Sequence, residues 1–331
     1  FMLEEDGRID EQIFNEYVSL NLRHPPQFIH VASAEDAFEV LKTNKIDLVI
    51  TMLSVGGMDP FSLSRKIKDT NAHIPIVVLT PFSREVSLKL SKEDTSAIDY
   101  VFCWLGNTDL LLAIIKLIED EMNSPFDVPE VGVQCILLVE DSVRFYSSYL
   151  PLIYKILFKQ SRKFMTEGLN EHQQMMRMRG RPKILLARNF EEAIEVYSTY
   201  HKNILGIISD VSFKHNGVKD SQAGVALARQ VKGDNPFIPF LLQSSDMSNQ
   251  VVAKEIRVSF IHKHSKFLLQ ELREFLNNYL AFGDFVFVNP ETGQEVARAS
   301  DLQDFQEKLL SIPNESLQYH FKRDHVSKWL T

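Results

Sequence analysis

Four short apolar runs in the middle of the chain each end in side chains that could do chemistry. The clearest run, 206–208, leads through Ser209 into an acid, Asp210. Continuous apolar runs are typical of buried parallel strands, and in open α/β sheets ligands bind just beyond the carboxyl ends of such strands. The other runs cover 135–139, 239–243 and 258–262. Together, the four runs predict one site made of Glu140, Asp141, Asp210, Ser244 and Lys263.

The residue types in this set favour phosphoryl chemistry with a divalent cation. Clustered carboxylates repel one another, so they suit a hard cation, and Mg²⁺ prefers oxygen ligands in octahedral geometry. A hydroxyl group and an ammonium group beside the acids suit the oxygens of a phosphoryl group. We therefore expect Mg²⁺ as the cofactor of this site.

The same residues, in the same order, resemble the response-regulator receiver domain over about 134–281. The resemblance implies that Asp210 is the phosphoacceptor and that Ser244 and Lys263 contact the acyl phosphate. It also implies Mg²⁺ ligands at Glu140, Asp141, Asp210 and the backbone carbonyl of Ser212.

Two further positions follow from the resemblance. Phe260 stands where the family has its switch aromatic residue. His264 departs from the family, which usually has proline after the lysine, and cis peptide bonds are largely a proline feature. The loop 213–220 after Asp210 is long and is expected to flank the site and limit access to it.

Apolar runs alternate with helical patterns through most of the chain, as in a doubly wound parallel sheet. In the first third we expect helices at 13–22 and 35–42 and strands at 28–31, 47–51, 75–80 and 100–102. With the resemblance, this predicts an α/β fold of two flavodoxin-like receiver domains, at 1–122 and 134–281, plus a small α+β segment at 282–331. The chain begins too close to its first helix for a complete first strand, so we expect a fragment.

The first domain resembles a receiver whose chemistry is missing. Met52 stands where the phosphoacceptor acid would be, Cys103 replaces the lysine, and Trp104 follows it, whereas Thr80 is retained. Methionine has no nucleophilic oxygen and no metal-binding carboxylate. The acids at 4–6 are interpreted as the solvated start of a helix, with a metal-site remnant as the alternative. We therefore expect a pseudo-receiver.

Two connecting segments stand out. Residues 123–133 contain two prolines and a glycine without periodicity, which predicts a linker. A helical pattern continues from Val143 through Met178, far longer than the corresponding receiver helix. Its basic end, at Arg177, Arg179, Arg181 and Lys183, is interpreted as a solvated face, with a docking arm as the alternative.

The last 50 or so residues predict a hairpin over 284–299, a helix from Asp301 that stops near Pro313, and a last helix ending at Trp329. The tail motifs at 314–320 and 325–330 look like the segment that joins tandem receivers to a phosphoenolpyruvate synthase/pyruvate phosphate dikinase-type catalytic region in a bacterial family. The resemblance implies that this chain is the regulatory part of such a protein, without the catalytic half.

Composition limits the class of protein. Hydrophobic residues make up 44% of the 331 residues, enough for packed cores, and the formal net charge is -8, which argues against nucleic acid as a partner. The two cysteines, Cys103 and Cys135, lie in apolar runs, so reduced core thiols and a cytoplasmic location are expected. The apolar run 110–118 is shorter than the roughly 20 residues that span a bilayer, so we expect no membrane association.

Two functions from different classes follow. The first is a two-component signalling module that is phosphorylated on Asp210 by a sensor histidine kinase or a phosphotransfer protein, and that regulates a downstream region. The alternative is a non-switching scaffold that uses receiver folds for dimerisation. A dinucleotide enzyme is disfavoured, because no glycine-rich phosphate loop follows a strand.

Overall fold

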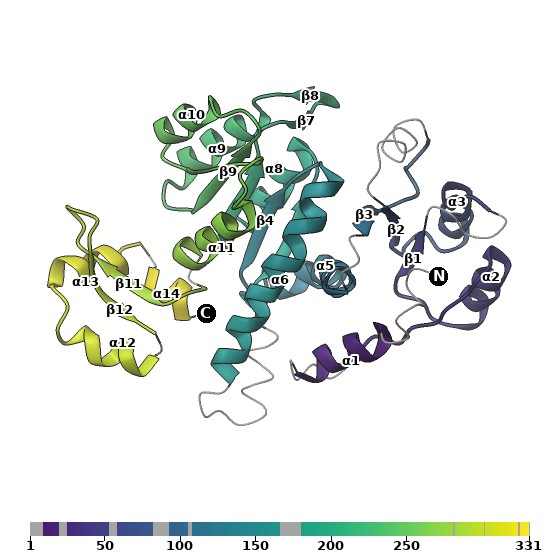
Figure 1. The fold of residues 1–331 in the computed structure, drawn as a ribbon, viewed down its shortest axis with the longest axis horizontal. Coiled ribbons are helices and arrows are strands. Elements are labelled where there is room, and N and C mark those ends of the chain that lie inside the picture. The colour runs from purple at the N-terminus through teal and green to yellow at the C-terminus, as the bar shows by residue number, and fades with distance from the viewer. Residues whose placement is uncertain are drawn as a thin grey trace. The chain divides into compact units, whose positions relative to one another are not determined.

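The structure, a computed structural model, describes residues 9–19, 25–52, 58–81, 93–104, 108–165, 180–280, 282–300, 302–323 and 325–330 (Figure 1). The chain forms two compact units. Unit 1 comprises Phe1–Ile118 and Ser142–Pro151, and unit 2 comprises Glu119–Asp141 and Leu152–Thr331. The acids at 4–6 lie outside the described residues.

A five-stranded parallel sheet is the centre of unit 2. Its strands are β4 (Cys135–Val139), β5 (Lys183–Ala187), β6 (Ile204–Asp210), β9 (Phe240–Ser244) and β10 (Ser259–His262). The order across the sheet is β10-β9-β6-β4-β5. Counted along the chain this is 2-1-3-4-5, the flavodoxin-like arrangement. The predicted fold class is therefore confirmed in unit 2.

Helices on both faces explain why these strands are apolar along their length, and every residue of β4 and β6 is buried. Residues of three helices pack with Leu137 and Ile207 on one face. These helices are α8 (Phe190–Tyr200), α9 (Ala223–Asp234) and α10 (Asn249–Glu255). The helix α11 (Leu268–Tyr279) contacts β10, and Figure 1 draws it and α6 (Val143–Met165) in front of the sheet.

The helix after the first acids is long, as the sequence predicts. α6 continues through Pro151 to Met165, and the rest of the expected helix, with Arg177 and Arg179, lies outside the described residues. The interpretation of Arg181 and Lys183 as a solvated face is wrong, because both side chains are buried. Each forms an ion pair with an acid, as a buried charge requires.

The acid that holds Arg181 is Asp120, on α5 (Asp109–Asp127). Its fully buried carboxylate accepts hydrogen bonds from Arg181 Nη2 at 2.6 Å, the Tyr154 hydroxyl at 2.8 Å and the Ile184 N–H at 3.0 Å. Burial disfavours the charged guanidinium, but Asp120 more than offsets this and raises the pKa of Arg181. The end of α5 is thereby joined to β5, and residues 123–127 of the expected linker are helical.

Unit 1 contains a parallel three-stranded sheet of order β1-β2-β3. Its strands are β1 (Val49–Met52), β2 (Ile76–Pro81) and β3 (Tyr100–Trp104), and its helices include α1 (Ile9–Ser19), α2 (Ala34–Thr43) and α3 (Pro60–Thr70). Asp59 caps α3 by accepting hydrogen bonds from the N–H groups of Phe61 and Ser62. The expected strand at 28–31 is not formed, because those residues pair with no neighbouring strand and leave Ile29 and Val31 exposed.

The C-terminal part of unit 2 is a small α+β segment, as predicted. Its hairpin pairs β11 (Phe285–Val288) with β12 (Glu295–Ala299), and three helices follow: α12 (Leu302–Leu309), α13 (Asn314–Phe321) and α14 (His325–Leu330). The expectation of one last helix is therefore wrong. The break between α13 and α14 lets Trp329 return to the hairpin core, where its indole N–H donates to the Gly283 carbonyl at 2.9 Å.

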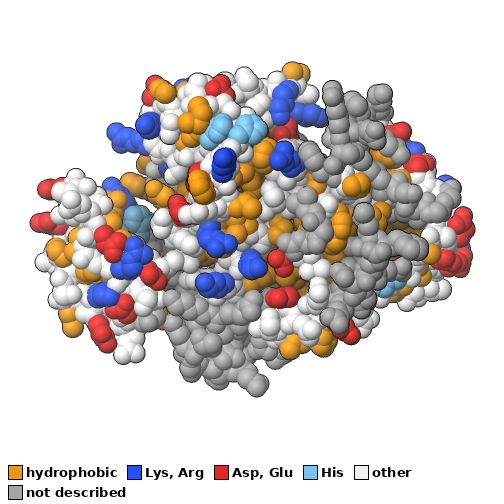
Figure 2. Space-filling model, in the orientation of Figure 1, with side chains coloured by type: hydrophobic (Ala, Val, Ile, Leu, Met, Phe, Trp, Pro, Cys, Tyr) orange, Lys and Arg blue, Asp and Glu red, His pale blue; other side chains and the backbone are white. Residues whose placement is uncertain are grey.

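Cys103 and Cys135 are free and buried, which agrees with the prediction of core thiols. Burial raises the pKa of the Cys135 thiol to about 12, so it stays protonated. No helix in the described ranges is long and apolar enough to cross a bilayer. On the face drawn in Figure 2, acidic, basic and apolar side chains are interspersed.

Candidate functional site

The candidate site lies at the carboxyl edge of the five-stranded sheet in unit 2. Parallel strands end at the same edge, so residues that are distant in sequence meet there. Glu140 and Asp141 follow β4, Asp210 ends β6, Ser244 ends β9 and Lys263 follows β10. The order of the strands therefore brings the residues predicted from the sequence to one place.

Carboxylates and an ammonium group form the centre of the site. Carboxylate oxygens of Glu140, Asp141 and Asp210 lie within 4.8 Å of one another. Lys263 Nζ is 2.7 Å from Glu140 Oε2 and 2.9 Å from Asp210 Oδ2. The side chains of Glu140 and Lys263 are 0% and 4% exposed, whereas Asp210 is 11% exposed. One lysine thus holds two acids, and Asp210 is the more accessible of them.

The register of the sheet explains why these side chains share a face. Asp210 is aligned with Gln243, and Gln243 with Ile261. Because side chains alternate between faces, Lys263, two residues beyond Ile261, projects to the same face as Asp210. The buried amide of Gln243 lies in this row, and its atoms have no hydrogen-bond partner in the described part of the chain.

Ser244 is held by its own strand end. Its Oγ accepts hydrogen bonds from the Asp246 N–H at 3.0 Å and from Asn249 Nδ2 at 3.0 Å. A hydroxyl has two lone pairs and one hydrogen. Both lone pairs are used, so the hydroxyl hydrogen is the part of Ser244 that remains to donate. Asn249 was not expected from the sequence, because amide residues near a strand end give no distinctive signal.

The backbone around Asp210 is closely packed. Asp210 Oδ1 accepts a hydrogen bond from the N–H of Val211 at 2.7 Å. Gly224, at the start of α9, donates its N–H to the Val211 carbonyl at 2.9 Å. A Cβ atom on Gly224 would lie only 2.0 Å from the Asp210 carbonyl oxygen. Only glycine allows α9 to approach β6 this closely, and the approach fixes the position of the acid.

Three other predicted residues lie around this centre. Phe260 is partly buried and packs with the core on the face opposite the acids. Ser212 lies two residues after Asp210, which ends β6. His264 is exposed, and the described chain contains no cis peptide bond at this or any other position.

The segment after Asp210 contains a residue that sequence reasoning missed. The expected loop 213–220 is instead a hairpin of β7 (Phe213–His215) and β8 (Val218–Asp220). Lys219 Nζ lies 2.8 Å from Asp141 Oδ2. The signal for this hairpin was the Asn216–Gly217 pair, since Asn-Gly is the preferred two-residue hairpin turn. Nothing in the sequence indicated which acid Lys219 would meet.

The described strand ends of unit 1 carry no such cluster. Met52 ends β1, Thr80 is buried in β2, and Cys103 is buried in β3 beside Thr80. The Cys103 N–H donates to Ser147 Oγ at 2.9 Å. Within the described residues, the acids of unit 2 are the one group that could hold a metal ion.

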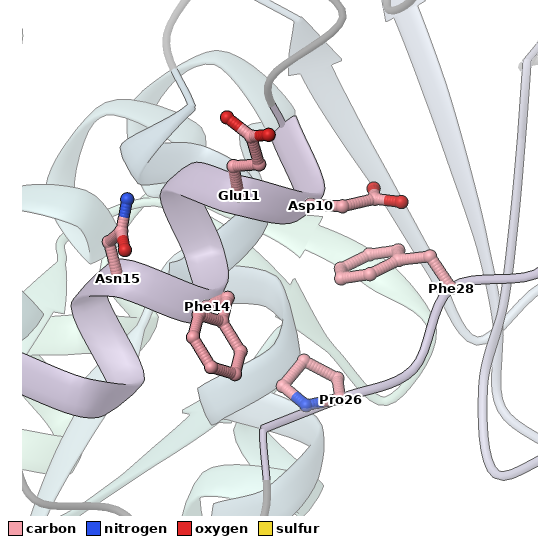
Figure 3. A pocket seen from close by; sticks show the side chains of 6 residues that line it. All are labelled: Asp10, Glu11, Phe14, Asn15, Pro26 and Phe28. Atoms are coloured by element: carbon pink, nitrogen blue, oxygen red, sulfur yellow. The ribbon is translucent and has the colours of Figure 1, made fainter.

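Unit 1 also has an open hollow of about 470 Å³, lined by Asp10, Glu11, Phe14, Asn15, Pro26 and Phe28 (Figure 3). The first four residues project from α1, and the other two come from the extended segment after it. Phe14 is 51% exposed, and the Asp10 carboxylate is 3.1 Å from His30 Nε2. The hollow shares no residue with the acid and lysine set.

No family model matches the sequence, and no curated protein matches it. Among solved structures, a response regulator receiver domain protein from Clostridium thermocellum aligns with 44% of this chain and 94% of its own, at 17% identity and a TM-score of 0.29. A putative two-component system response regulator/GGDEF domain protein aligns with 81% of this chain and 94% of its own, at 11% identity and a TM-score of 0.30. The flavodoxin-like fold of unit 2 is shown by its own strand order.

Proposed function

We propose that unit 2 is a two-component receiver module that accepts a phosphoryl group on Asp210. The observation that carries the proposal is the position of Lys263 Nζ, 2.7 Å from Glu140 and 2.9 Å from Asp210, at an edge that also holds Asp141. Three carboxylates in one place would otherwise disfavour one another's charge. Such an arrangement is useful where a negatively charged group has to be received.

In the proposed reaction, a carboxylate oxygen of Asp210 attacks the phosphorus of a phosphohistidine on a sensor histidine kinase or a phosphotransfer protein. The phosphorus–oxygen bond forms as the phosphorus–nitrogen bond breaks, and the imidazole leaves with the electron pair. Lys263 then pairs with a phosphoryl oxygen, and Ser244 donates its remaining hydroxyl hydrogen to another. Charge-assisted hydrogen bonds of this kind are roughly twice as strong as neutral ones.

The donor set fits Mg²⁺. Its carboxylate oxygens are hard ligands within 4.8 Å of one another, which suits a small oxygen-preferring cation. We propose Glu140, Asp141, Asp210 and the backbone carbonyl of Ser212 as the residues that hold it. When bound, the cation supplies positive charge opposite the phosphoryl oxygens.

Phosphorylation is proposed to act through Phe260. Movement of Ser244 and Lys263 toward the phosphoryl group would change the packing of β9 and β10, where Phe260 lies. Moving a two-state equilibrium from 1:99 to 99:1 requires about 5.5 kcal/mol. A few charge-assisted hydrogen bonds, at roughly 1.5–3 kcal/mol each, are sufficient.

The remaining assignments are proposals of the same kind. We propose a pseudo-receiver at 1–122, a connecting segment at 123–133, the receiver at 134–281 and the start of a downstream region at 282–331. Met52 and Cys103 support the pseudo-receiver, because methionine cannot act as the phosphoacceptor acid and cysteine cannot replace the lysine of a receiver. The tail motifs support placement before a phosphoenolpyruvate synthase-like catalytic region.

For the cellular setting, we propose a cytoplasmic protein with a kinase partner and self-association. Nucleic acid is not proposed as a partner, because the net charge is -8 and basic side chains are mixed with acidic ones on the face in Figure 2.

A specific observation favours the alternative, a scaffold that is not phosphorylated. Each of the three acids already has a lysine beside it: Lys263 contacts Glu140 and Asp210, and Lys219 contacts Asp141. A site whose acids are paired in this way is stable without any ligand. The scaffold would keep the receiver fold for packing alone.

The two functions separate in one experiment. The protein is incubated with Mg²⁺ and acetyl phosphate, and the phosphorylated fraction is measured by intact mass. The parent should gain one phosphoryl group and Asp210→Asn none, while Glu255→Gln, at an exposed acid that ends α10, should label like the parent. Labelling of Asp210→Asn at the parent's level would disprove the assignment. A parent that is never labelled, and whose assembly is unchanged by beryllofluoride, would support the scaffold.

A further inference from the structure

The hairpin β7–β8 places a positive charge on the acid cluster. Lys219, on the second strand, lies with Nζ 2.8 Å from Asp141 Oδ2. The Lys219 side chain is 57% exposed and the Asp141 side chain 22% exposed, so the pair is at the surface of the site rather than in the core. This position makes the pair easy to separate.

The hairpin is nevertheless well positioned. Phe213, at its base, is fully buried in the core of unit 2. At its tip, Asn216 and Gly217 have φ values of 52° and 77°, which match the turn that the twist of a two-residue hairpin requires. The N–H of Asn216 also donates to Glu191 Oε1 at 2.8 Å, at the start of α8. Lys219 is therefore directed to Asp141 by a fixed backbone and not by chance.

The three acids of the site pair with two lysines. Lys263, which is buried, holds Glu140 and Asp210, whereas Lys219 holds Asp141. A divalent cation bound by Asp141 would stand within a few ångströms of the Lys219 ammonium group, and like charges at that distance repel. The ion pair and the ion thus compete for the same carboxylate.

We propose that Lys219 is a built-in competitor of the divalent cation: it occupies Asp141 in the metal-free protein and leaves when the carboxylate binds the ion. Lys219 then sets the affinity of the site for the cation and links its occupancy to the hairpin. The inference rests on the proposed Mg²⁺ site. It assigns a role to a residue outside the receiver positions that the sequence resemblance covers.

The test is a titration of the full 331-residue chain with Mg²⁺ alone, measured by isothermal titration calorimetry. Lys219→Met should bind Mg²⁺ about two- to fivefold more tightly than the parent, the change that corresponds to one exposed ion pair. Lys219→Arg keeps the positive charge and should restore the parent affinity. The matched control is Lys214→Met, because Lys214 is the exposed cross-strand neighbour of Lys219. This variant removes an equal charge, but Lys214 contacts no acid among the described residues. The Mg²⁺ affinity of Lys214→Met should therefore equal that of the parent.

A second measurement follows the hairpin itself. In amide hydrogen exchange, Mg²⁺ should reduce protection of the hairpin in the parent, because its contact with Asp141 is lost. In Lys219→Met that contact is missing from the start, so Mg²⁺ should leave hairpin exchange unchanged. A purely structural lysine would show no such dependence on Mg²⁺.

Failure of this inference is distinguishable from failure of the proposed function. Equal Mg²⁺ affinities for the parent, Lys219→Met and Lys214→Met would overturn the role of Lys219, even if acetyl phosphate labels Asp210. Tighter binding by Lys219→Met in a protein that acetyl phosphate never labels would support the competitor and reject the phosphoacceptor. Absence of Mg²⁺ binding in every variant would overturn the inference.

Discussion

Lys263 Nζ lies 2.9 Å from Asp210 Oδ2 and 2.7 Å from Glu140 Oε2, and its side chain is almost completely buried. Glu140 follows β4 and Asp210 ends the neighbouring strand β6, and the lysine reaches both across β9 from the end of the edge strand β10. A buried ammonium group is tolerable only with such partners. The lysine therefore contributes to stability as well as to the proposed chemistry.

Replacing this lysine should destabilise the protein. Lys263→Met removes the ammonium group from a fully buried carboxylate, and breaking a buried ion pair in this way typically costs about 3–5 kcal/mol. Urea unfolding would measure the loss. The double variant Glu140→Gln/Lys263→Met should regain part of the stability, because the charge of Glu140 is removed together with its partner, while Asp210 still lacks its lysine. A double variant as unstable as the sum of the two single variants would show that the pair is not coupled.

Alanine substitution should change the stability of the protein in opposite directions at two glycines of α9. In Gly224→Ala the new Cβ would lie 2.0 Å from the Asp210 carbonyl oxygen, so the backbone must move, at a cost of about 1–3 kcal/mol or more. Labelling by acetyl phosphate should fall with it, because Asp210 shifts. Gly233→Ala meets nothing within 4 Å and should stabilise the protein by about 0.5–1 kcal/mol. Thermal unfolding of both variants checks this, and a neutral Gly224→Ala would contradict the close approach.

The buried acid of α5 should be sensitive to loss of its charge. Asp120→Asn leaves Arg181 buried without its carboxylate, and we expect a loss of about 3–5 kcal/mol. Glu130→Gln, at an exposed position shortly after the helix, is the control and should change stability by less than about 0.5 kcal/mol. Chemical denaturation monitored by circular dichroism measures both. Equal stability of the two variants would mean that the network adds little beyond packing.

The C-terminal segment should lose stability as the pH falls, because His320 is buried in it. Burial, with a smaller contribution from Arg323, lowers the pKa of His320 to about 4, and its Nε2 accepts a hydrogen bond from the Val288 N–H. The unfolded segment takes up a proton as the pH falls below about 6.5, but the folded segment does not until about 4. Its stability is therefore complete above pH 6.5 and declines between these values, by up to about 3 kcal/mol.

Trp329 reports this change, because it lies in the same small core. In a Trp104→Phe background, its fluorescence after denaturant titration at several pH values gives the stability of the segment. His320→Gln retains an acceptor for Val288 and should flatten the dependence between pH 6.5 and 4. An equal slope in both proteins would assign the acid sensitivity to other groups.

The sequence by itself determined the sheet of unit 2 and the members of its site. Continuous apolar runs such as 135–139 and 206–208 are typical of strands covered on both faces, and the residues after parallel strands gather at one edge. For that reason the sequence alone predicts that Glu140, Asp141, Asp210, Ser244 and Lys263 lie at one edge of the sheet. The hairpin and the first helix of the tail could be predicted for a different reason, because they depend on neighbours in the chain, whereas the expected single last helix is two helices.

Only the tertiary structure decided which charges meet. Arg181 and Lys183 look like a solvated basic run, yet they are buried against Asp120 and Asp127, which lie some 60 residues earlier. The strand expected at 28–31 found no partner, although its local pattern is apolar. Lys219 meets Asp141 because a two-residue turn folds the chain back over the site. Ion pairs and strand pairing join residues that are distant in sequence, and local periodicity carries no information about such partners.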